Sequence, residues 1–166
     1  MITSAWLLTF WLFVVGWFCC CTTTGHICTF CAGDSGPTNV SVTFGGIVDG
    51  ACDCDQLNTT YIVPPETTNC WYYGTGDIDA ACGYFLWPRV LDFGATWGWQ
   101  VELQVACTST NCIVDIVRWR WDSGAESQFD CSAARTLTFY SHTTFGTLGP
   151  NVCDQSAWSS TTCQVN

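Results

Sequence analysis

Cysteine is the residue type here with the most chemistry to offer, and there are 14 cysteines among 166 residues. Two pairs, Cys28/Cys31 and Cys52/Cys54, have spacings that suit a metal site or a disulfide group. Four thiolates from two such pairs can hold a zinc ion in a tetrahedral structural site. The same four cysteines can instead form disulfides that cross between the pairs. We expect disulfides, with structural zinc as the alternative, because such a cysteine content is typical of proteins from oxidising compartments.

The remaining cysteines are predicted to form further disulfides. Each bridge that closes a loop of this size stabilises a fold by roughly 2–4 kcal/mol, mainly by restricting the unfolded chain. Sequence alone does not fix the pairing. The other disulfide candidates are Cys70, Cys82, Cys107, Cys112, Cys131, Cys153 and Cys163. The candidates for bridges between chains are Cys19, Cys20 and Cys21.

Two groups of aspartates lie in loops that are rich in turn residues. Carboxylates clustered beside glycine can bind calcium through their oxygen atoms. The spacing does not fit an EF-hand, and aspartate is also a common turn residue, so we expect solvated turns, with calcium as the alternative. The aspartates concerned are Asp49, Asp53 and Asp55 in one loop and Asp77 and Asp79 in another.

The charge balance narrows the possible partners. The chain has 14 acidic and 4 basic residues, a formal net charge of -10. A nucleic-acid partner is not expected, because phosphate binding needs clustered Lys and Arg. An anionic membrane surface would repel the chain for the same reason. Neither His26 nor His142 has a catalytic partner at a recognisable spacing, so we predict that the protein is not an enzyme.

The first 21 residues carry no charged side chain and are nearly all apolar. Their length suits a signal peptide or a membrane anchor, and the remaining alternative is an assembly arm that docks on another protein. Any contact with a membrane would run through residues 1–21, if they are retained. Cleavage would leave an odd number of cysteines, so one would be free or paired between chains. Residues 22–166 are predicted to form one cysteine-rich domain.

Beyond Cys28 the apolar residues alternate with polar ones, the pattern of strands with one buried face. The clearest run is Trp97–Val105, and Val40–Phe44, Val117–Trp121 and Thr136–Phe139 follow the same rule. Clusters of Gly, Asp and Pro separate the runs. We therefore predict an all-β fold, an antiparallel β-sandwich of about eight short strands that is stapled by disulfides.

Exposed aromatic rings are the usual platform for sugar stacking, although alternating tryptophans more often pack in a core. The stacking candidates are Tyr72, Tyr73, Trp87 and Trp158. Two segments, Asn39-Val40-Ser41 and Asn58-Thr59-Thr60, match the acceptor sequence for N-glycosylation. Asn39 and Asn58 are therefore candidates for glycosylation if the host modifies its secreted proteins.

The order of these motifs resembles a known pattern. It runs through Cys28/Cys31, Val42–Ile47, Cys52/Cys54, Leu57–Tyr61, Cys70–Tyr73, Cys82–Tyr84 and the alternating strand Trp97–Val105. It is similar to cysteine-rich β domains in planctomycete-type bacterial proteins and in phage or prophage tail-region proteins, over about residues 28–163. The resemblance implies a surface-exposed or virion-associated structural module without an assigned enzymatic activity.

Taken together, these features predict a subunit that works outside the cell, on the cell surface or on a virion. The expected role is structural or adhesive, with copies of the chain assembling into a filament, coat or tail component. The expected partner is therefore the chain itself, as a homo-oligomer or polymer. The alternative is a carbohydrate-binding module that recognises surface glycans through its aromatic residues.

Overall fold

A computed structural model describes residues 39–66, 71–92, 97–107, 114–122, 133–146 and 149–166. The predicted N-terminal segment 1–21, with Cys19, Cys20 and Cys21, lies outside these residues. Cys28, Cys31, Cys70, Cys112 and Cys131 lie outside them as well.

Ten strands and two short 3-10 helices make up the described chain. In order they are β1 (Val40–Gly45), η1 (Cys54–Leu57), β2 (Thr60–Val63), β3 (Pro65–Glu66), β4 (Trp71–Tyr72), β5 (Gly74–Asp79), β6 (Cys82–Asp92), β7 (Trp97–Cys107), β8 (Val114–Asp122), β9 (Arg135–Phe145), η2 (Gln155–Ser160) and β10 (Thr162–Val165). Three of the strands, β6, β7 and β9, are 11 residues long, so they exceed the short strands that were predicted.

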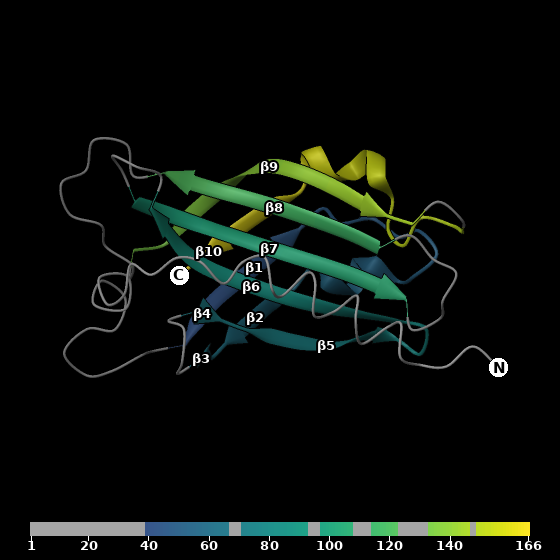
Figure 1. Cartoon of the computed structure of the whole chain (residues 1–166), viewed down its shortest axis with the longest axis horizontal. Coiled ribbons are helices and arrows are strands. Elements are labelled where there is room, and N and C mark those ends of the chain that lie inside the picture. The colour runs from purple at the N-terminus through teal and green to yellow at the C-terminus, as the bar shows by residue number, and fades with distance from the viewer. Residues whose placement is uncertain (1–38, 67–70, 93–96, 108–113, 123–132, 147–148) are drawn as a thin grey trace.

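Eight strands form a single antiparallel sheet in the order β2-β1-β10-β9-β8-β7-β6-β5 (Figure 1). Strands β5 to β9 follow one another as consecutive neighbours, while β10 returns to lie between β9 and β1. Strands β3 and β4 make a separate two-stranded sheet. The all-β, antiparallel class with about eight main strands is therefore confirmed.

The sheet curls so that residues from its two halves meet on one side, here called the inner face. The rings of Phe44 on β1 and Trp119 on β8 lie 5.1 Å apart. Tyr61 on the edge strand β2 meets Tyr84 on β6, again with 5.1 Å between the ring centroids. The prediction of a sandwich stays a prediction, because the facing halves belong to one hydrogen-bonded sheet.

The alternation that predicted the strands also selects the buried side chains. Trp99, Val101, Leu103 and Val105 on β7 all point to the inner face and are fully buried. The alternate side chains of β7, beginning with Gln100, point to the outer face. Burial of this apolar inner face contributes most of the driving force for folding, at roughly 25 cal/mol for each Å² removed from water.

Helix η2 closes one side of this core. Its Trp158 is buried, and its ring lies edge-on to Trp119 at 6.2 Å. The indole N–H of Trp119 donates to the hydroxyl of Thr161, 3.1 Å away, and that hydroxyl donates to the carbonyl of Trp158. At the far side of the aromatic cluster, burial raises the pKa of Tyr61 to about 12, with the nearby Tyr84 adding to the effect. Its phenol therefore stays neutral.

Residues 49–58, here called the clasp loop, fasten two distant parts of the sheet. Cys52 is disulfide-bonded to Cys82 at the start of β6, and Cys54 is disulfide-bonded to Cys153 just before η2. Backbone hydrogen bonds add to the second attachment, since Ala51 and Cys52 donate to the carbonyls of Asn151 and Val152.

Gly50 is required at this attachment because the two backbones approach closely. A Cβ atom at position 50 would lie 2.7 Å from the carbonyl oxygen of Val152, which is closer than a real side chain tolerates. The clasp loop thus joins β6 to the segment before η2, which lie on different parts of the curled sheet.

Replacing Cys54 and Cys153 together with alanine should lower the free energy of unfolding by about 2–5 kcal/mol, because this bridge closes a long loop. The two cysteines are 99 positions apart in the chain. Chemical denaturation of both proteins in the same buffer without reducing agent, so that the other bridges stay intact in each, measures the difference. Replacement of the exposed Ser159 by alanine is the control, and an unchanged midpoint in the cysteine variant would show that the bridge carries no stability.

Candidate functional site

The outer face of β6, β7 and β8 carries a row of charged side chains across the three strands. The register places Trp87, Glu102 and Arg118 side by side. Arg118 Nε donates to Glu102 Oε2 at 2.7 Å, and Arg89 Nη2 lies 3.7 Å from the same oxygen. Glu102 is only 7% exposed, so two guanidinium groups balance its buried charge. Burial lowers the pKa of Arg89, the nearby Glu102 opposes that shift, and Arg118 and Arg120 add to it.

Two residues further along each strand, a second row has the same arrangement, with the neutral Gln100 in the place of Glu102. Arg120 Nε donates to Gln100 Oε1 at 2.7 Å, and Gln100 is fully buried beneath it. The guanidinium carbon of Arg120 lies 3.6 Å from the centre of the Tyr140 ring. Tyr140 takes this position because the register of β8 and β9 shifts here, so that it has no partner on β8. The shift re-aims the ring outward, as bulges commonly do.

The aromatic stacking candidates divide into two sets. Tyr73 and Trp87 are half-buried on the outer side and their ring centroids lie 5.7 Å apart, with Phe85 6.2 Å from Tyr73. Tyr72 and Trp158 are 4% and 1% exposed and pack in the core, so their assignment to a sugar platform is wrong. A ring with no exposed face has nothing to stack on a ligand.

The two described cysteines of the predicted zinc or disulfide group, Cys52 and Cys54, form separate bridges with cysteines outside that group. Cys52 and Cys54 pair with Cys82 and Cys153, and Cys28 and Cys31 lie outside the described residues. A sulfur in a disulfide is not a thiolate ligand. Cys107 is disulfide-bonded as well, and its Sγ lies within 4.8 Å of those of Cys52 and Cys82.

Cys163, which was predicted to be bridged, is instead a free thiol among the described cysteines. It is fully buried on β10, and burial raises the pKa of its thiol well above the ordinary range. The alternation of β10 explains the outcome, because Cys163 and Val165 both point into the core. There the thiol serves as a small apolar group.

Two aspartates of the calcium alternative, Asp49 and Asp79, accept backbone hydrogen bonds. Asp49 Oδ1 accepts the N–H of Asp55 at 2.7 Å. Asp79 accepts the N–H of Asp53 at 3.2 Å and that of Ala81 at 2.7 Å. The bond from Asp53 ties the clasp loop to the turn between β5 and β6, and the other two bonds lie within one loop each, which is the role expected of turn aspartates.

The two glycosylation candidates differ in their surroundings. Asn39 is exposed just before β1. Asn58 is exposed as well, but its side chain accepts the N–H of Ile47 at 2.7 Å and donates to the carbonyl of Ile47 at 2.8 Å. Asn58 therefore has a structural task at the end of the clasp loop, and modification of either residue stays a prediction.

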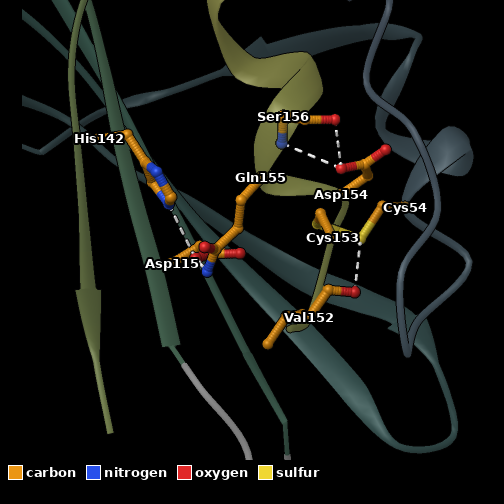
Figure 2. A network of polar contacts seen from close by, with 8 residues as sticks. All are labelled: Cys54, Asp115, His142, Val152, Cys153, Asp154, Gln155 and Ser156. Atoms are coloured by element: carbon orange, nitrogen blue, oxygen red, sulfur yellow. Dashed lines mark hydrogen bonds and ion pairs between the residues drawn. A yellow bond between two sulfur atoms is a disulfide. The ribbon is translucent and has the colours of Figure 1, made fainter. Parts of the chain in front are cut away.

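A buried polar cluster lies between β8, β9 and η2 (Figure 2), and the sequence did not predict it. Asp115 is fully buried, and its Oδ1 lies 2.8 Å from His142 Nε2 and 3.2 Å from Gln155 Nε2. Its other oxygen has no hydrogen-bond partner among the described residues. Asp115 and His142 are 27 positions apart in the chain, so no local sequence motif predicts their contact.

A histidine that is hydrogen-bonded to a buried carboxylate forms two of the three members of a hydrolytic Ser-His-Asp triad. The other neighbour of the His142 ring is Trp158, with 6.0 Å between the centroids. Among the described residues no hydroxyl or thiol group hydrogen-bonds to this imidazole. Asp154, beside the cluster, caps η2 through Ser156, and that hydroxyl together with the backbone N–H lowers the pKa of Asp154 (Figure 2).

No protein-family model, curated protein or solved structure matches this chain. The resemblance to planctomycete-type and phage tail-region domains therefore stays a prediction. In the part of the chain that the structure describes, no helix has the length and apolar character needed to cross a membrane.

Replacing Asp79 with asparagine should reduce stability at pH 7 and lose that effect in acid. Hydrogen bonds from the backbone of Ala81, and then of Asp53 and Cys82, lower the pKa of Asp79 below its ordinary value of 3.8. Ionised Asp79 thus stabilises the fold above pH 3.8, and the contribution disappears as the pH falls through the folded-state pKa. Urea unfolding of both proteins from pH 7 to pH 2 measures this, and a difference that stays constant with pH would contradict it.

Proposed function

We propose that this chain is a structural or adhesive subunit that assembles with copies of itself outside the cell or on a virion, without a catalytic role. The observation that carries the proposal is the edge strand β2. It hydrogen-bonds to β1 on one side only in the described sheet, and it carries Ile62, which is 62% exposed. Strand β2 has no charged residue. Unprotected edges of this kind add strands from other chains.

The opposite edge strand is protected in the usual way. Strand β5 carries Asp77 and Asp79, and its register with β6 shifts between them. Charges and bulges both discourage pairing with another chain. The contrast between the two edges supports β2 as the side on which a second copy adds.

The disulfides support the proposed location. Bridges such as Cys54–Cys153 persist where the surroundings are oxidising, and they suit a subunit that must endure outside the cell. The proposed architecture is a sandwich formed by the two halves of one curled sheet, in line with the resemblance to bacterial and phage surface domains. Cys19, Cys20 and Cys21 would add covalent links between copies.

The contacts of the buried charged groups support a role without catalysis. Glu102 is held by two arginines, and His142 is held by Asp115. Each of these groups is committed to a neighbour within the fold.

Replacing Ile62 with lysine should reduce assembly strongly while the fold survives, because the side chain is mostly exposed and a charge on an edge opposes strand addition. The measurement is electron microscopy and sedimentation of the native material without reducing agent. Gln164→Lys is the matched control, since Gln164 is also exposed but lies on β10, which is paired on both sides. Normal assembly of the Ile62 variant, or equal damage from the control, would count against the β2 edge.

A second candidate function is a carbohydrate-binding module, favoured by the adjacent rings of Tyr73 and Trp87. Trp87 lies next to Glu102 in the register, so an aromatic surface borders polar groups that can hydrogen-bond a sugar. This function would be recognised by glycan binding to isolated monomers. Assembly without glycan binding favours the structural role.

A further inference from the structure

Three cysteine sulfurs meet where β6 begins and β7 ends. The Sγ atoms of Cys52, Cys82 and Cys107 all lie within 4.8 Å of one another. Cys52 comes from the clasp loop, Cys82 is the first residue of β6, and Cys107 is the last residue of β7. Among the described residues, no other three cysteine sulfurs come this close together. One bridge uses only two sulfurs, so the third lies beside a bond to which it does not belong.

Cys82 is placed so that it can bond to either of its neighbours. In the structure it is bonded to Cys52, with 6.2 Å between the two Cα atoms. Cys107 lies directly opposite Cys82 in the register of β6 and β7. Opposed residues of antiparallel strands project to the same face, and their Cα atoms are about 4.5 or 5.5 Å apart. Both separations fall within the range of about 4.4–6.8 Å that a disulfide spans, so a Cys82–Cys107 bridge needs no separation or sliding of the strands.

The three sulfurs differ in their access to solvent. Cys52 and Cys82 are 2% and 1% exposed, whereas Cys107 is only half-buried at the border of the core. Cys107 is itself disulfide-bonded, and its partner is a cysteine outside the described residues. The rate of thiol–disulfide exchange depends on access to the sulfur that is attacked. A thiol from solvent therefore reaches the bridge of Cys107 more readily than the Cys52–Cys82 bridge.

We propose that Cys52, Cys82 and Cys107 form a thiol–disulfide exchange site, at which Cys82 changes its partner from Cys52 to Cys107. The co-reactant is an external dithiol, which opens the bridge of Cys107 and thereby starts the exchange. The product is a chain in which β6 and β7 are joined by a disulfide and Cys52 is a free thiol.

The bonds and electrons balance in each step. A thiolate of the dithiol attacks the sulfur bonded to Cys107, forms a mixed disulfide with that sulfur, and expels Cys107 as a thiolate. The second thiol of the reagent closes the reagent's own disulfide, so the reagent loses two electrons and the former partner of Cys107 leaves as a thiol. The Cys107 thiolate attacks Cys82 Sγ, and the Cys52–Cys82 bond breaks as the Cys82–Cys107 bond forms. The electron pair leaves on Cys52 Sγ, which takes a proton from water, and this last step has no net oxidation or reduction.

The external reagent is needed because the described chain holds no thiol that can start the exchange. Cys163 is the free thiol among the described cysteines. It is fully buried, and burial raises its pKa well above the ordinary range, so it stays protonated near neutral pH. Only a thiolate attacks a disulfide. The Cys52–Cys82 bridge therefore persists until the bridge of Cys107 is opened.

The exchange changes what holds the clasp loop. The loop loses its covalent bond to β6 and keeps the Cys54–Cys153 bridge to the segment before η2. Cys52 becomes a thiol between the exposed residues Ala51 and Asp53. A structural bridge is thus converted into a thiol that oxidants or other thiols can modify.

The first test is partial reduction of the full, oxidised chain. Dithiothreitol is raised until the original bridge of Cys107 is lost, free thiols are trapped with N-ethylmaleimide, and pepsin peptides are identified by mass spectrometry. We expect alkylated Cys52 together with peptides that join Cys82 to Cys107. Cys52 still joined to Cys82 after the bridge of Cys107 is lost would overturn the proposal. So would alkylation of Cys52 and Cys82 together, without any Cys82–Cys107 peptide.

A second test needs no reductant. Cys52→Ser leaves Cys82 as a thiol beside the bridge of Cys107, so peptides that join Cys82 to Cys107 should appear in this variant. Cys54→Ser is the matched control, because it leaves Cys153 unpaired with no such pair of sulfurs beside it. Cys153 should then be alkylated as a single thiol.

The outcomes of the second test also separate exchange at this site from general scrambling. Alkylation of Cys82 in the Cys52→Ser variant, with no peptide joining Cys82 to Cys107, overturns the proposal. Capture of a new partner by Cys153 in the control overturns it as well, since exchange would then not depend on the three sulfurs. If Cys52→Ser does not fold, partial reduction of the native chain decides the question alone.

Discussion

The attachment of the clasp loop to both halves of one sheet is the constraint on which the rest of the structure depends. The sheet ends at β2 and β5, and these two strands are not hydrogen-bonded to each other. The short ladder of β3 with β4 connects the chain after β2 to the chain before β5, and Tyr73 donates a backbone hydrogen bond to Pro64 beside it. Closure also relies on side chains that meet across the inner face, such as Tyr61 with Tyr84, and on the bridges from Cys52 and Cys54.

The same closure decides which groups face outward. With Trp99 of β7 and Trp119 of β8 turned inward, the alternate positions place Gln100, Glu102, Arg118 and Arg120 on the outside of the same strands. Their pairing across neighbouring strands gives the buried Glu102 and Gln100 charged or polar partners.

Local periodicity was enough to predict the strands and their buried faces, as Trp99 to Val105 illustrate. The partners of individual cysteines could not be predicted, because Cys54 and Cys153 meet only after the whole sheet has curled. Tyr72 and Tyr73 differ by one position, yet one is in the core and the other is on the outer side. In so short a strand as β4 the sequence alone does not fix that parity. Asp115 and His142 likewise depend on the register of β8 with β9.

The most direct test of the central claim is mass spectrometry of peptides cut from the native protein without reduction. Pepsin suits the task, because it cuts in acid, where disulfides do not rearrange. The account predicts peptides that join Cys52 to Cys82 and Cys54 to Cys153. Peptides that join Cys52 or Cys54 to Cys28 or Cys31 instead would contradict it, since the clasp loop would then be fastened to the N-terminal segment and not to the sheet.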